Sequence, residues 1–357
     1  MFVGIANTPR DYAWGSHGAI SELLGLQASG AVEAELWLGD HPGSPSRVIG
    51  SSNTLADVVD DRLPFLLKIL AADSPLSLQA HPTSKQAAAG FARENELGIP
   101  VDAPERNYRD ASHKPELIYA LSDEFSALCG FRSVPQILDL LSSLPEATPL
   151  AGRLRRDGLK NTFEWLVTRG DGVRDLVDVI SVGGDATARL LAAAFPGDPG
   201  IVVSLLLNRV TLRKGEVLYL PAGNIHAYLS GVGVELMASS DNVLRGGLTP
   251  KHVDVPELLS VLNFQPIPVP YLEAERPSPG VEVFRPDVRD FVLVRVEDEG
   301  SYVITGPAIV FCAEGDLEVT GATGATNISF GDALYVTVEE GTLEFSGLGV
   351  VFVATTG

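Results

Sequence analysis

Residues 215–226 read GEVLYLPAGNIH, and this stretch decides the fold class. Gly215 can open a turn, and the short apolar run after it is typical of a buried strand. Pro221 and Gly223 then predict a tight turn at the end of that strand. His226 is expected to begin the return strand, with its ring directed into the interior of a barrel. A turn with an incidental histidine is the alternative for so short a pattern.

A similar segment recurs near the C-terminus. Residues 330–336 (FGDALYV) repeat the glycine, the acidic residue and the short apolar run of residues 214–220 (KGEVLYL). The repeat predicts two related β units, although two generic hairpins could also look alike. The second strand ends in Thr337 without the proline, glycine and histidine of the first. We therefore expect no metal in the C-terminal unit.

Two regions of the chain are predicted to be helical. Residues 83–97 predict a helix with Thr83 as its N-cap, and residues 134–194 carry apolar side chains at helical spacing. Residues 266–279 are rich in proline and read as a linker to a C-terminal part of β character. The predicted fold is therefore mainly β: a catalytic unit (1–132 and 201–262), a helical insertion (133–200) and a C-terminal β unit (263–357).

Composition excludes several function classes. The formal net charge of −20 should repel nucleic acid and anionic lipid, but it allows an anionic small molecule in a locally basic pocket. The two cysteines, Cys129 and Cys312, fit neither a disulfide framework nor a CxxC site. The N-terminus lacks the features of a signal peptide, and no apolar stretch is long enough to span a bilayer. We expect a cytoplasmic protein that acts as a monomer, although no sequence feature determines the oligomeric state.

Two further segments place polar or charged side chains on one face. In residues 77–82 (SLQAHP), strand alternation places Ser77, Gln79 and His81 on one face, where an amide oxygen and a ring nitrogen can reach one ion. In residues 108–116 (YRDASHKPE), Lys114 and Glu116 share a face if the chain is extended, as the intervening proline favours. Taken alone, each has a simpler explanation: a hydrogen-bonded histidine and a solvated ion pair.

Residues 241–251 (DNVLRGGLTPK) contain two cations around an open glycine pair. Arg245 offers a fork of donors and Lys251 a point charge, and both suit a phosphate group. A basic surface loop is the alternative, but such a loop would be an exception in so acidic a chain.

Together these segments resemble the signature regions of the type I mannose-6-phosphate isomerases, a family of the cupin superfamily. The family pattern Tyr-x-Asp-x-Asn-His-Lys-Pro-Glu is matched over residues 108–116 except at Ser112, and the long signature over residues 226–251 is matched except at Gly246. Thr83 replaces an aspartate common after the family's Gln-x-His-Pro. Residues 12–16 and 34–39 resemble family segments as well. The likeness spans about residues 5–260 and fades in the C-terminal unit.

The resemblance implies cupin (jelly-roll) barrels and a zinc-dependent aldose–ketose isomerase. It would interconvert mannose 6-phosphate and fructose 6-phosphate by proton transfer through a cis-enediol. One Zn²⁺ per chain would be bound by Gln79, His81, Glu116 and His226. Arg245 matches the family's catalytic arginine, and Glu235 and Lys114 are the candidates for the proton-carrying base. The expected substrate contacts are Ser77, Lys251 and Trp14, of which Ser77 and Lys251 suit the phosphate.

Three other functions fit the sequence less well than this one. A cupin oxygenase typically needs a redox metal and a histidine-rich ligand set, whereas Gln79 and Glu116 favour a redox-inert ion. A cupin that only binds sugar should lack a ligand or the arginine, and the sequence has both. Fusion to a nucleotidyltransferase is excluded by the length of the chain and by the lack of a glycine-rich phosphate loop.

Overall fold

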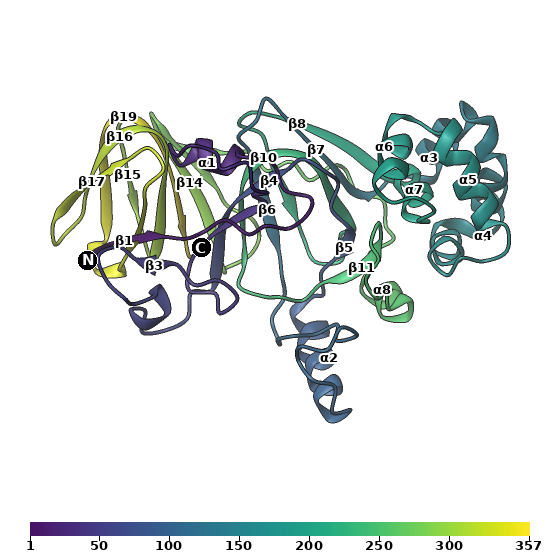
Figure 1. The fold of residues 1–357 in the computed structure, drawn as a ribbon, viewed down its shortest axis with the longest axis horizontal. Helices are drawn as coiled ribbons and strands as arrows, with labels where there is room; N and C mark the ends of the chain where they lie inside the picture. Colours follow the sequence, from purple (N-terminus) through teal and green to yellow (C-terminus); the bar gives the residue numbers. More distant parts are fainter.

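Two antiparallel sheets form the framework of the computed structural model, which describes all 357 residues (Figure 1). The nine-stranded sheet comprises β2 (Glu35–Leu38), β4 (Phe65–Ala72), β5 (Leu78–Ala80), β6 (Glu116–Ala120), β7 (Glu124–Phe131), β8 (Leu207–Arg213), β9 (Val217–Leu220), β10 (His226–Ala238) and β11 (Leu244–Gly247). The ten-stranded sheet comprises β1 (Phe2–Ala6), β3 (Arg47–Val48), β12 (Glu275–Ser278), β13 (Val281–Phe284), β14 (Val292–Glu297), β15 (Gly300–Val303), β16 (Ala308–Thr320), β17 (Ala325–Ser329), β18 (Ala333–Val336) and β19 (Thr342–Thr355).

The long strand β10 organises the nine-stranded sheet. Its first residues pair with β5 and β7, and its last residues pair with β4 and β6. A strand that pairs with four others curls the sheet around itself, and the side chains on the inner face then converge. This convergence brings residues far apart in sequence into one site.

The two similar segments form similar local structures. Residues 217–220 form β9 and residues 333–336 form β18. Gly215 and Gly331, which precede them, have positive φ angles of 95° and 86°, a backbone conformation that favours glycine. The predicted turn-and-strand units are confirmed at this level.

The helices gather mainly beside the nine-stranded sheet. They are α1 (Ala19–Leu23), α2 (Ser84–Glu96), α3 (Val134–Ser142), α4 (Thr148–Val167), α5 (Val173–Gly183), α6 (Ala186–Ala194), α7 (Gly200–Val203) and α8 (Val255–Val261). Figure 1 shows α3 to α7 clustered at one end of the molecule, with α2 projecting separately. The predicted cap of α2 is confirmed, because the Thr83 side chain accepts a hydrogen bond from the Gln86 amide. No helix combines the length and the apolar character needed to cross a membrane.

An apolar core joins the two sheets. It contains Leu67 and Val234 from the nine-stranded sheet and Phe311 and Phe352 from the ten-stranded sheet, all buried. Tyr119 packs edge-on against the ring of Phe352, with 4.9 Å between ring centroids. The C-terminal unit therefore supports the back of the sheet that carries the candidate site.

Two details depart from the sequence-based expectations. The predicted catalytic unit includes residues 2–6 and 47–48, but β1 pairs with β18 and with β3, so both belong to the ten-stranded sheet. This pairing covers backbone groups of β18 that would otherwise form a bare sheet edge. The predicted linker 266–279 also contains a strand, β12, which pairs with β13. The wider division into three units stays a prediction.

Candidate metal centre and cavity

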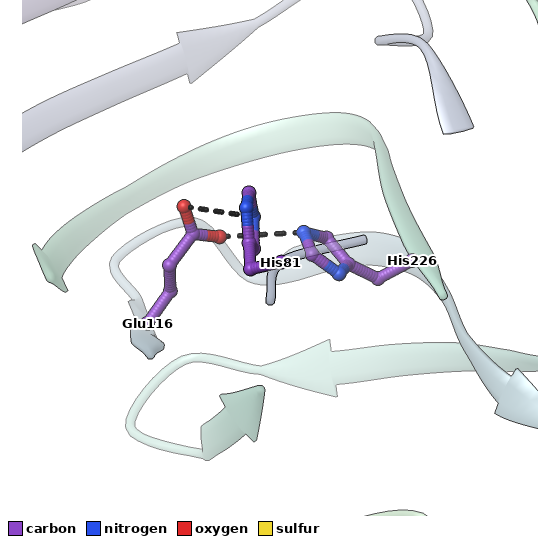
Figure 2. A group of neighbouring side chains, drawn as sticks. All are labelled: His81, Glu116 and His226. Atoms are coloured by element: carbon purple, nitrogen blue, oxygen red, sulfur yellow. Dashed lines mark ion pairs between the residues drawn. The ribbon is translucent and has the colours of Figure 1, made fainter. Parts of the chain in front are cut away.

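Three buried side chains from separate strands meet inside the nine-stranded sheet. His81 follows β5, Glu116 begins β6 and His226 begins β10 after the turn at Gly223, whose φ is 78°. Their ligand atoms all lie within 4.8 Å of one another, and none of the three residues is more than 2% exposed. Figure 2 shows the Glu116 carboxylate facing both rings.

The hydrogen bonds of the two rings fix their tautomers. Nδ1 of His81 lies 2.8 Å from the Asn242 carbonyl oxygen, and Nδ1 of His226 lies 3.2 Å from that of Asn224. A carbonyl oxygen only accepts, so each Nδ1 carries a hydrogen. In the neutral ring the Nε2 lone pair then points at Glu116. Both Nε2 atoms are buried without a hydrogen-bond partner.

The charges around Glu116 make this arrangement costly without a cation. Burial lowers the pKa of His81 to about 4 in spite of the attraction of Glu116. Burial alone would raise the pKa of Glu116, but the Lys114 ammonium is the main group that holds it well below its usual range. A carboxylate therefore faces nitrogen lone pairs at 3.3 Å on both sides. A positive ion between them would turn this repulsion into coordination.

The type and closeness of the donor atoms suit zinc. Metal–ligand bonds of about 2.0–2.1 Å place neighbouring donors about 3.3–3.4 Å apart in a tetrahedron. The two rings face different oxygens of the Glu116 carboxylate, each at 3.3 Å, and the ligand atoms all lie within 4.8 Å of one another. The three side chains can therefore hold Zn²⁺ and leave one position for a fourth ligand.

Gln79 lies next to this centre. It is the direct strand partner of His226 on one side and of Arg245 on the other. Directly opposed residues of an antiparallel pair project from the same face, so these three side chains share a face. The geometry suits Gln79 as the fourth protein ligand, and that role stays a prediction.

A cavity of about 770 Å³ opens above the centre. Eight of the ten predicted site residues line it: Trp14, Ser77, Gln79, Lys114, Glu116, Glu235, Arg245 and Lys251. The other two are His81 and His226, which are buried beside Glu116. The structure thus brings all the predicted site residues to one cavity and its floor.

The comparisons with known proteins agree with this geometry. The family model for the catalytic domain of phosphomannose isomerase type I matches residues 2–134. The mannose-6-phosphate isomerase of Escherichia coli K12 is 36% identical over 380 residues, covering 97% of each chain. The chain belongs to the type I phosphomannose isomerase family. The human mannose-6-phosphate isomerase is 33% identical over an alignment that covers 82% of this chain and 81% of the human chain.

Solved structures of phosphomannose isomerases have the same fold. The Salmonella typhimurium enzyme bound to fructose 6-phosphate and zinc superposes with a TM-score of 0.91 at 34% identity, covering 99% of both chains. A mannose 6-phosphate isomerase bound with zinc and yttrium gives the same score and coverage. The prediction of a mainly β cupin fold is therefore confirmed.

Sequence reasoning missed a buried ion-pair cluster beside the candidate metal centre. Lys68 lies between two carboxylates, 3.0 Å from Glu235 and 3.4 Å from Glu35, and all three line the cavity. Burial would lower the pKa of Lys68, but the carboxylates raise it well above its usual value. Burial raises the pKa of Glu235 in spite of Lys68. Lys68 is the single charge in the apolar strand FLLKILAA, and that isolation was the available signal.

Three cations gather on another side of the cavity. Arg109, which was not predicted, joins Arg245 and Lys251 among the lining residues. Burial and Arg109 lower the pKa of Arg245, while burial, Arg245 and Arg109 lower that of Lys251. Neither Arg245 nor Lys251 has a carboxylate partner, so this mutual repulsion favours binding of an anion.

Asn242 connects the metal centre to the segment that carries Arg109. Its side chain is fully buried, accepts the Arg109 N–H at 2.7 Å, and donates to the carbonyls of Asp110 (2.9 Å) and Ser112 (2.8 Å). Its own carbonyl accepts the hydrogen on Nδ1 of His81. One residue thus orients a candidate ligand and the chain leading to Lys114 and Glu116.

Asn242→Ala is expected to weaken zinc binding by less than the roughly 10- to 100-fold typical of losing an outer partner of a metal ligand, because the backbone carbonyl that holds His81 remains. The variant frees the segment around residue 110 and loosens the His81 contact. Zinc retained against a competing chelator measures the effect. Asn327→Ala, on the exposed strand β17, is the control. Equal zinc retention in both variants would show that Asn242 does not orient the centre.

Proposed function

We propose that this chain is a zinc-dependent isomerase that interconverts mannose 6-phosphate and fructose 6-phosphate. One observation carries the proposal: two buried histidine nitrogens without a hydrogen-bond partner converge with a carboxylate on the floor of a cavity lined by unpaired cations. The names of the relatives and the fructose 6-phosphate and zinc bound to the Salmonella enzyme support this choice of substrate and metal.

The ligands proposed for zinc are His81, Glu116, His226 and Gln79. When bound there, zinc supplies a Lewis acid that polarises sugar oxygens next to the reacting carbons. Glu116 also pairs with Lys114 at 2.9 Å, so the centre and the cavity share one charge network.

The cationic side of the cavity is proposed to bind the phosphate. Lys251 and Ser77 are the contacts expected from the sequence, and Arg109 adds a third. Arg245 lies nearest the centre in the strand register, since it pairs directly with Gln79. Its guanidinium is therefore assigned to the negative charge that develops on the sugar oxygens in the transition state. Trp14 contributes an aromatic wall for the sugar.

Isomerisation moves a proton between C1 and C2 through a cis-enediol, and a base must carry that proton. Glu235 is the better supported of the two candidates. It lines the cavity, and burial raises its pKa toward the working range of a general base. Both candidates are ion-paired, Lys114 with Glu116 and Glu235 with Lys68, so the raised pKa of Glu235 decides between them. We assign proton transfer to Glu235 and electrostatic positioning to Lys114.

Glu235→Gln is expected to lower kcat about 100-fold with zinc content unchanged, because the amide keeps the shape but takes up no proton. Steady-state kinetics on zinc-loaded protein tests this. Glu35→Gln is a matched control, since Glu35 is also buried, also lines the cavity and also pairs with Lys68. Equal losses in the two variants would assign the effect to the shared ion-pair cluster instead.

A coupled assay tests the function as a whole. The zinc-loaded chain should convert mannose 6-phosphate to fructose 6-phosphate, lose activity when zinc is chelated and regain it when zinc is returned. Absence of turnover in zinc-loaded, folded protein would overturn the proposal. Oxygen consumption with the same sugar would favour a cupin oxygenase.

A monomeric state and a cytoplasmic location stay predictions of the sequence. Size-exclusion chromatography with light scattering tests the first, and cell fractionation tests the second.

A further inference from the structure

A carboxylate from the helical insertion holds the segment between the two predicted cations. Asp198 lies between α6 and α7, and its Oδ1 accepts the N–H groups of Gly200 at 2.7 Å and Leu248 at 2.9 Å. Its Oδ2 accepts the Thr249 N–H at 3.4 Å. Residues 248 and 249 follow β11 and lead to Lys251. A side chain 50 positions away in sequence thus fixes this backbone.

The held backbone has an uncommon conformation. Leu248 has a φ of 54°, in the left-handed region that residues with side chains rarely adopt. Its side chain is 1% exposed and packs in the core of the helical insertion. A Cβ on Gly200 would lie 2.7 Å from Leu248 Cγ, so glycine is needed where the two segments meet. Such a conformation persists only where its surroundings impose it.

The two ends of the segment are anchored differently. Arg245 is held by the ladder between β11 and β5, where it pairs with Gln79. That ladder ends at Gly247, after a register shift. Beyond it, the Lys251 N–H is bonded to the Thr249 hydroxyl at 3.1 Å, and Thr249 is bonded to Asp198. The position of Lys251 therefore depends on Asp198, whereas that of Arg245 does not.

We propose that Asp198 is a positioning residue for substrate affinity. By fixing the backbone of Leu248 and Thr249, it places the Lys251 ammonium where it can receive the phosphate of the substrate. The inference rests on the proposed function, since it takes a phosphosugar as the ligand. It also gives the helical insertion a part in binding, beyond the wall that Ala194 and Phe195 add to the cavity.

Asp198→Asn tests the proposal. The amide oxygen can still accept from Gly200 and Leu248, but the NH₂ group then faces the Thr249 N–H, so the link to Thr249 is lost with little change in shape. We expect KM for the phosphosugar and the inhibition constant of inorganic phosphate to rise about tenfold, as for the loss of one charge-assisted hydrogen bond. The zinc content should stay the same, and kcat should change by less than about twofold.

Asp185→Asn is the matched control. Asp185 belongs to the same insertion and caps α6 by accepting the Ala188 N–H at 2.8 Å, but it does not contact residues 245–251. The Asp185→Asn substitution should lower thermal stability without raising KM or the phosphate inhibition constant. Equal KM values in both variants, with an active wild type, would overturn the inference and leave the proposed function standing. An inactive wild type would instead overturn the proposed function.

Hydrogen exchange on the wild-type protein tests the same point without a variant. The Leu248 and Thr249 amides should exchange slowly before any phosphate is added, because Asp198 already holds them. Fast exchange that becomes slow only with inorganic phosphate would show that the ligand, and not Asp198, orders the segment. That result would overturn the inference even if Asp198→Asn could not be obtained in folded form.

Discussion

Replacing His226 by alanine is expected to abolish bound zinc and turnover together. The change removes one of the three clustered donors and one of only two ring nitrogens, and the remaining His81, Glu116 and Gln79 should bind zinc too weakly to retain it. Losing a residue that merely orients a ligand weakens metal binding about 10- to 100-fold, and loss of the ligand itself should exceed that range. Zinc per chain, measured by atomic absorption after dialysis against a weak chelator, is compared with turnover in the same sample.

His17→Ala serves as the control for the His226 variant, because His17 is exposed and far in sequence from all three candidate ligands. Circular dichroism establishes that both variants remain folded. Retention of one zinc per chain in His226→Ala would remove His226 from the ligand set. Loss of turnover with full zinc would give His226 a different role, in contact with the substrate.

The sequence predicted those features that local chemistry encodes. Gly215 and Gly223 mark a turn before β9 and a turn before β10, and both have the positive φ that glycine allows. Thr83 caps α2 as expected, because the capping pattern lies within four residues. Strand alternation placed Gln79 with its neighbours, and family resemblance named the ligands. Each of these signals is short-range or carried by a motif.

Pairings between distant segments could not be predicted in this way. Nothing in residues 2–6 (FVGIA) indicates that they pair with β18, more than 300 residues later. Asp198 could not be recognised for the same reason, because its role depends on contacts with the backbone of Leu248 and Thr249 and not on residues close to it in sequence. Strand partners are selected by packing across the whole molecule, which a local pattern does not record.

Of two site residues that the sequence analysis missed, one had a local sequence signal and one had none. Lys68 carried a local signal, a lone charge within a buried strand, and could have been recognised as a paired buried cation. Asn242 had no such local signal, since an asparagine after an aspartate indicates only a turn. Its four contacts with His81 and residues 109–112 exist only once β5 and β10 have brought those segments together.

Arg245→Ala is expected to lower kcat about 100- to 1000-fold while zinc content stays near one per chain. Arg245 is next to Gln79 in the strand register, so its charge acts near the metal centre. Removing one preorganised donor to a developing oxyanion typically costs a factor of this size. Zinc should be retained, because Arg245 donates no ligand atom. Steady-state kinetics with parallel metal analysis measures both quantities.

The split between kcat and KM distinguishes the two roles open to Arg245. A group that stabilises the transition state lowers kcat, whereas a group that only binds phosphate raises KM. Arg245→Lys keeps the charge but loses the donor fork, so it should recover part of kcat and not all of it. Arg213→Ala, on the exposed end of β8, is the control and should match the wild type. An Arg245→Ala enzyme with normal kcat and raised KM would move Arg245 to the phosphate, beside Lys251.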